Sequence, residues 1–215
     1  MTVPDPTQPR WRRRKTARPG EIVSAAMAVF AEKGFAAARL EDIAGRAGVS
    51  KAALYLYFET KTDLFHAVVG EAVVPNVERI RLMAEGYEGR FADILPLILS
   101  RLAHVAETSA LGGVAKMVVG ESRNFPDLAR IWHDAVVSQG LGLMAGLIER
   151  AQVRGEVRPG DPRLMAVSVA GAMLAGILFD ETFVPVGGEP IHLPTLAALH
   201  ARTVLDGMLS AEARS

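Results

Sequence analysis

The chain has 215 residues, of which 50% are hydrophobic and 22% charged, so it can build a core in one large or two small domains. It has no cysteine, which excludes a disulfide framework and a thiolate metal site and fits a reducing cytoplasm. The formal net charge is zero, but residues 1–61 hold 11 Lys and Arg against 6 Asp and Glu, whereas the remainder holds 13 against 18. This asymmetry indicates an amino-terminal part that meets phosphate.

Residues 1–16 are expected to form a basic, flexible arm. Residues 1–9 are polar and rich in proline, and the run Arg10–Lys15 follows them. No apolar stretch comes after these charges, as a secretory signal would require. Two interpretations stay open: a solubilising tail, or an arm that lies along DNA phosphates or enters a minor groove.

The first predicted helix covers residues 19–33, where apolar residues recur at helical spacing until Gly34 stops the pattern. Phe35 is expected to fold back over the core. A second unit follows over residues 39–61, RLEDIAGRAGVSKAALYLYFETK, and it is typical of two short helices joined by a tight turn. Gly48 suits the positive φ of that turn, and Ser50 is a good N-cap for the second helix.

The second short helix has two distinct faces. Leu54 and Phe58 lie four residues apart and are predicted to point into the core. Lys51, Ala52 and Tyr55 share another face, which combines a small residue for close approach with donors for phosphates and base edges. This combination favours a helix that enters the major groove over a generic helical hairpin.

Here the residues resemble a known family. The strings IVSAAMAVFAEKGF, LEDIAGRAGVSKAALYLYF and ETKTDLFHAVV, within residues 17–69, are similar to the DNA-binding domain of tetracycline-repressor-like (TetR/AcrR) transcription regulators. The match is ungapped and covers about a third of the chain; the rest resembles the family only in helical character and length. The resemblance implies an all-α fold with a helix-turn-helix domain at residues 17–62 and a ligand-binding and dimerisation domain at residues 63–215.

The resemblance also implies roles for single residues. The position of Lys61 binds a DNA phosphate in the family, which would explain a lysine at an unfavourable helix start. The family often has Thr or Ser before the second helix, whereas this chain has Ala37, Ala38 and Arg39. Either another group caps that helix or its first turn frays, and Arg39 is then free to approach phosphate or a base edge. The predicted DNA-binding set is Arg39, Ser50, Lys51, Ala52, Tyr55, Tyr57 and Lys61.

A long helix is expected from Lys61 to about Glu85, with a kink or break at Pro75. Further helices are predicted at about 91–108, 112–123, 126–152, 162–180 and 193–211, with no strands. No apolar run is expected to be long enough to span a bilayer, and Met165 to Phe179 comes nearest.

The helix near residues 162–180 is rich in small residues: Ala166, Ala170, Gly171, Ala175 and Gly176. Small residues let two helices approach closely, either inside one subunit or at a dimer interface with the final helix. The family resemblance implies a homodimer through these last two long helices, so that two heads read a palindromic operator.

The middle helices are candidates for an effector cavity, because methionines and aromatics make adaptable apolar walls. Such residues are more often plain core. A small apolar or amphipathic effector is expected, and the candidate residues are Met117, Phe125, Trp132, His133, Met144, Leu147 and Met173.

No enzyme signature is present. The five histidines do not have zinc-site spacing, and Gly120–Asn124 begins like a nucleophile elbow but lacks the closing glycine. No metal or cofactor is expected. The sequence therefore predicts a cytoplasmic, ligand-responsive transcription regulator, most simply a repressor, without membrane attachment. The alternative is a helical DNA-binding or architectural module that senses no ligand.

Overall fold

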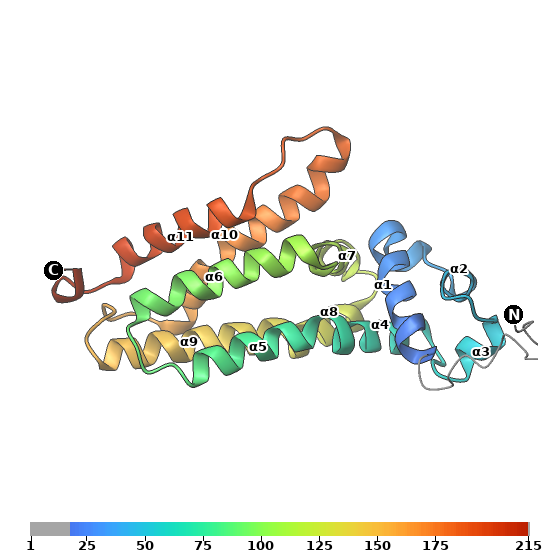
Figure 1. Cartoon of the computed structure of the whole chain (residues 1–215), viewed down its shortest axis with the longest axis horizontal. Coiled ribbons are helices and arrows are strands. Elements are labelled where there is room, and N and C mark those ends of the chain that lie inside the picture. Colours follow the sequence, from blue (N-terminus) through green and yellow to red (C-terminus); the bar gives the residue numbers. More distant parts are fainter. Residues whose placement is uncertain (1–17, 215) are drawn as a thin grey trace, which may run out of the picture.

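The computed structural model describes residues 18–214 (Figure 1). In this range the chain is helical and contains no strand, only an isolated bridge between Val157 and Leu209. The all-α prediction is thus confirmed, whereas the predicted arm over residues 1–16 lies outside the described range. The helices are α1 (Arg18–Ala37), α2 (Leu40–Arg46), α3 (Lys51–Tyr55), α4 (Lys61–Val68), α5 (Val74–Glu85), α6 (Phe91–Thr108), α7 (Leu111–Glu121), α8 (Pro126–Trp132), α9 (Ser138–Val153), α10 (Pro162–Phe183) and α11 (Leu193–Met208).

Helices α1 to α4 form the N-terminal domain, which lies at one end of an elongated molecule (Figure 1). Phe30 of α1 and Phe65 of α4 are fully buried, with ring centroids 6.2 Å apart in an edge-on arrangement. Ile43 of α2 and Leu54 of α3 are also fully buried, so every helix of the domain contributes to one core. Phe35 closes this core, with its ring centroid 5.4 Å from that of Phe30.

Gly34 interrupts α1 as expected. Its φ of 77° and ψ of 169° are not helical, and a side chain at that φ would be strained. The chain turns here toward α2, and Phe35 is thereby directed into the core.

A long helical connection runs from Lys61 to Glu85 and joins the two domains (Figure 1). Between α4 and α5 lies a π-helical turn, η1 (Val69–Val73), in which the N–H of Val74 donates to the carbonyl of Val69. Pro75 has no N–H to complete the normal ladder of helix hydrogen bonds, so the irregularity falls next to it.

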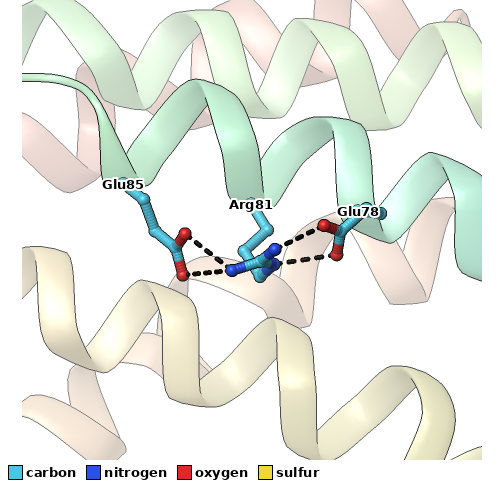
Figure 2. A network of polar contacts seen from close by, with 3 residues as sticks. All are labelled: Glu78, Arg81 and Glu85. Carbon is cyan, nitrogen blue, oxygen red and sulfur yellow. Dashed lines mark hydrogen bonds and ion pairs between the residues drawn. The ribbon is translucent and has the colours of Figure 1, made fainter.

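On α5, the Arg81 guanidinium bonds to both Glu78 and Glu85 (Figure 2), and these bonds raise the pKa of Arg81. Pairs at this spacing support an exposed helix.

Helices α5 to α11 form the C-terminal domain. Helix α6 packs on α11, and α9 packs on α10. The core between them is apolar, and its most buried members include Leu95, Leu99, Ile148, Met173 and Ala201. A second π-helical turn, η2 (His133–Val137), joins α8 to α9 and packs near η1.

Helix α10 is longer than the sequence suggested. Together with the following turn it covers Pro162–Val186 with a hydropathy of 1.7, which is long and apolar enough for a membrane span by length and composition. The expectation that no segment reaches this length is therefore wrong. Asp180 does not end the helix, which continues to Phe183, and the Asp180 carboxylate accepts the N–H of Ile191 at 2.8 Å. The helix packs on α7, α9 and α11, as a core helix would, yet only 28% of the apolar window is buried.

The small residues of α10 serve two different surfaces. Ala166 and Gly176 are buried, and a Cβ on Gly176 would lie 2.6 Å from Leu196 of α11. Gly171 and Ala175 are instead exposed. Close packing inside the subunit thus accounts for one face of α10 and leaves the other without a partner in the described chain.

Candidate DNA-binding interface

The turn between α2 and α3 has the predicted geometry. Gly48 has a φ of 67°, and the N–H of Val49 donates to the carbonyl of Ala44 at 3.0 Å. The Ser50 hydroxyl accepts the N–H of Ala53 at 3.1 Å, which confirms Ser50 as the N-cap of α3. These local contacts orient α3 with respect to α2.

Helix α3 presents its predicted polar face to solvent. Lys51, Ala52 and Tyr55 are exposed, and so is Tyr57 just beyond the helix. The opposite side is held in the core, since Leu54 is fully buried and Phe58 is 9% exposed.

The sequence interpretation missed Leu56, which is 82% exposed between the two tyrosines. A large apolar side chain placed this far into solvent suits contact with an apolar group such as a thymine methyl. Helical spacing could have located it, because a residue two positions from both Leu54 and Phe58 lies on the side away from the core.

Ion pairs cover much of the charge on this surface. Lys51 pairs with Glu41 of α2 and lies 5.8 Å from the Tyr55 ring centroid. The hydrogen bond from Lys51 lowers the pKa of Glu41, and the same bond raises the pKa of Lys51. A phosphate that approaches Lys51 therefore meets the Glu41 carboxylate as well. Two similar pairs, Lys33–Asp42 at 2.7 Å and Arg46–Glu32 at 2.6 Å, join α1 to α2.

Arg39 occupies the N-cap position of α2 in an extended conformation, and its own side chain makes no cap hydrogen bond. The hydrogen bond from Lys33 and, to a smaller extent, the backbone hydrogen bond from Arg39 lower the pKa of Asp42, so a carboxylate in the first turn serves the start of α2 in place of a Thr or Ser cap. The Arg39 side chain is exposed, as contact with a phosphate would require.

Lys61 has partners that the sequence did not predict. Its ammonium donates to the carbonyls of Phe35, Ala36 and Ala38 at 2.5, 3.2 and 3.0 Å, and lies 4.5 Å from the Phe35 ring centroid. Burial lowers the pKa of Lys61, and the charge of Glu121 partly offsets that effect. All three ammonium hydrogens are thus engaged within the protein, so a phosphate would gain this group only if one of these bonds opened.

The seven effector candidates do not form one site. Met117 is buried in the N-terminal core, where Phe125 and Trp132 also pack. Met144 and Leu147 of α9 and Met173 of α10 belong to the separate core of the C-terminal domain. His133 is exposed, and its Nδ1 lies 2.9 Å from an oxygen of Asp134. The candidates divide between two cores because α7 packs against α1 and α8 packs against α4, a relation that spacing within the chain does not encode.

No group of His, Asp and Glu suited to a metal ion occurs among residues 18–214. Figure 1 shows that the short helix α3 lies at one end of the molecule, opposite the end at which α11 finishes.

Two family models match the chain. Residues 22–68 match the model described as bacterial regulatory proteins, tetR family, and residues 88–191 match the tetracyclin repressor-like C-terminal domain. The first match contains α2, α3 and α4, and the second contains α6 to α10.

Known proteins agree with these matches. The HTH-type transcriptional repressor BepR of Brucella suis is 30% identical over 173 residues, which cover 73% of this chain and 77% of that protein. A TetR-family regulator structure from Mesorhizobium loti has a TM-score of 0.72 at 24% identity and covers 93% of this chain and all of its own. The structure of FadR from Bacillus subtilis with stearoyl-CoA has a TM-score of 0.73 at 21% identity, and the match covers 87% of this chain and 98% of FadR. By sequence and by fold, the chain belongs to the TetR family of transcription regulators.

Proposed function

We propose that this protein is a homodimeric, cytoplasmic repressor that binds a palindromic operator through α3 and leaves it when a small molecule binds. The observation that carries the proposal is the exposed side of α3. Lys51, Tyr55 and Leu56 are presented together, while Leu54 and Phe58 anchor the other side in the core. A short, rigidly anchored helix of this kind can enter a major groove.

Each exposed residue has a chemical role in this arrangement. Ala52 allows close approach of the backbone, and the hydroxyls of Tyr55 and Tyr57 offer hydrogen bonds to base edges or phosphates. Lys51 and Arg39 supply positive charge, which makes binding depend on salt. Lys61 supports the interface by fixing the carbonyls at the α1–α2 corner.

Members of this family bind DNA as dimers, and we assign the dimer contact of this chain to α10 and α11. Val167 and Leu174 of α10 are 48% and 46% exposed, and Leu199 of α11 is 54% exposed. Burial of these side chains against a second copy would remove apolar surface from water. We therefore assign the exposed apolar face of α10 to a partner copy rather than to a membrane.

The effector is proposed to be apolar or amphipathic and to bind within the C-terminal domain. The core described there holds no buried polar or charged side chain, so recognition would depend on apolar contact. FadR, which shares the fold, was crystallised with stearoyl-CoA. A ligand that prefers one arrangement of the two heads lowers operator affinity by shifting the population toward it.

The test is a gel shift with DNA from upstream of the protein's own gene, with stearoyl-CoA as the first effector probe. We expect Lys51→Ala, Tyr55→Ala and Leu56→Ala each to weaken binding by about tenfold, in the range for one lost base or phosphate contact. The control is Arg150→Ala, which removes an exposed cation at the C-terminal end of α9.

Unchanged binding by all three α3 variants would remove this helix from the interface. Equal affinity of the wild type for random and upstream duplexes, with a steep salt dependence, would instead support the alternative of a non-specific architectural module.

A further inference from the structure

The corner between α1 and α2, residues 34–38, is held by two opposite charges. From α7 in the C-terminal domain, the two Glu121 carboxylate oxygens accept the N–H groups of Phe35 and Ala36 at 2.7 and 2.6 Å. From α4, Lys61 donates to three carbonyls of the same corner. The corner therefore carries an anion on its amides and a cation on its carbonyls, each supplied by a different helix.

The position of Glu121 is unfavourable for its own helix. It is the last residue of α7, where the helix dipole is negative and a carboxylate is destabilising. The two backbone amides from the other domain compensate, since charge-assisted hydrogen bonds of this length are among the stronger ones. The carboxylate is thus stabilised by the contact between domains and not by α7.

Gly34 is shaped to this contact. A Cβ at Gly34 would lie 2.4 Å from a Glu121 oxygen, and the backbone has a φ of 77°. A side chain at this position would displace the carboxylate, and the positive φ separately favours glycine. The ring of Phe125, beyond the end of α7, packs 5.0 Å from that of Phe35 and adds an apolar contact to the polar one.

The other end of α7 touches α10. Lys116 of α7 donates to the backbone carbonyl of Glu181, and a Cβ on Gly112 would lie 2.6 Å from the Glu181 side chain. Between these ends, Val114 and Met117 are buried in the core of the N-terminal domain. Helix α7 therefore contacts the DNA-binding domain and α10, the helix to which we assign the dimer contact.

We propose that Glu121 is a positioning residue that sets the orientation of the DNA-binding domain on the body, and with it the distance between the two α3 helices of a dimer. The proposal rests on the proposed function. With the carboxylate in place, the domain meets the second half-site in a fixed geometry. Without the carboxylate, the domain binds one half-site equally well. Binding of both half-sites then costs free energy, because the two mobile domains must be fixed in one orientation.

The experiment compares wild type with Glu121→Gln, which keeps the size of the side chain and one good acceptor but loses the charge. Bound duplexes are first selected from a random pool, and affinities are then measured for a single half-site, for the full site, and for full sites lengthened or shortened by one and two base pairs. The matched control is Glu107→Gln, which neutralises an exposed carboxylate in the last turn of α6.

For Glu121→Gln we expect single-site affinity within about twofold of wild type, full-site affinity at least about tenfold weaker, and a flatter dependence on spacing, because part of the gain from joining two sites is lost. Amide hydrogen exchange at Phe35 and Ala36 should quicken in the variant alone. Glu121→Asp, which keeps the charge on a shorter side chain, should fall between the two.

An unchanged spacing profile in a folded variant would overturn the proposal. So would equal weakening of single-site and full-site binding, since that result would make Glu121 a support of the DNA-binding domain itself. Failure of the proposed function would give a different result: the wild-type protein would then select no duplex with two half-sites from the random pool.

Discussion

At the scale of single residues, the positive charge on the proposed DNA-binding face is already partly neutralised by an ion pair. Glu41 pairs with Lys51 on the surface that we assign to DNA contact, and the hydrogen bond to Lys51 lowers the pKa of Glu41 below its ordinary 4.5. The carboxylate is therefore ionised at neutral pH and competes with phosphate for the same ammonium. If α3 binds DNA as proposed, this arrangement weakens contact with every duplex, whatever its sequence.

Glu41→Gln should accordingly bind DNA more tightly. We expect affinity for specific and random duplexes to rise about three- to tenfold, and the slope of log affinity against log salt to steepen by about one. Fluorescence anisotropy between about 50 and 200 mM salt measures both quantities. Glu149→Gln, an exposed carboxylate near the end of α9, is the control. A slope equal to that of wild type would place Lys51 away from the phosphates.

At the scale of elements, the start of α6 depends on a residue from a distant loop. No side chain of Arg90 caps this helix, and the Glu156 carboxylate instead accepts the N–H of Phe91 at 2.7 Å and the Nε of Arg154 at 2.6 Å. Burial raises the pKa of Glu156, but the bonds from Arg154 and Phe91 lower it by more, so the folded value lies below 4.5.

The pH dependence follows from this direction. The folded state binds the Glu156 proton more weakly than the unfolded state, so its contribution is complete above pH 4.5 and is lost as pH falls through the depressed folded value. We expect Glu156→Gln to lower the free energy of unfolding by about 1 kcal/mol at pH 7, typical for loss of a helix cap. Thermal unfolding at pH 7 and near pH 3 should show the difference from wild type shrinking in acid. A constant difference would mean that the charge has no part in the cap.

At the scale of the whole molecule, two DNA-binding domains act together only if the bodies associate. Val167 and Leu174 are seven residues apart on α10, and both are about half exposed. Residues at this spacing lie on the same side of a helix, so one continuous apolar strip faces away from the subunit.

A charge in this strip should separate the subunits. We expect Leu174→Glu to sediment as a folded monomer and to bind the full operator about a hundredfold more weakly, while its affinity for a single half-site stays within about twofold. Val153→Glu places the same charge at an exposed apolar residue at the end of α9 and should remain dimeric. If the Leu174→Glu variant remained dimeric, the dimer interface would have to lie on another face of the subunit.

The sequence by itself determined the helices and the α2–α3 turn. Helix hydrogen bonds join residues four apart, and caps such as Ser50 act within three residues, so periodicity and local chemistry were sufficient for α6 and for the exposed face of α3. The charged pair Asp180 and Glu181 misled the prediction for α10, because a distant partner for Asp180 cannot be read locally.

Only the tertiary structure decided which helices meet. Glu121 bonds to amides 85 and 86 residues away, Lys61 turns toward carbonyls at the α1–α2 corner, and Met117 enters the core of the other domain. Such contacts depend on how whole helices pack, and a side chain's spacing along its own helix says which way it faces but not what it faces. The physical reason is that packing energy is shared over many side chains of several helices, whereas the conformation of each helix depends mainly on its near neighbours in the chain.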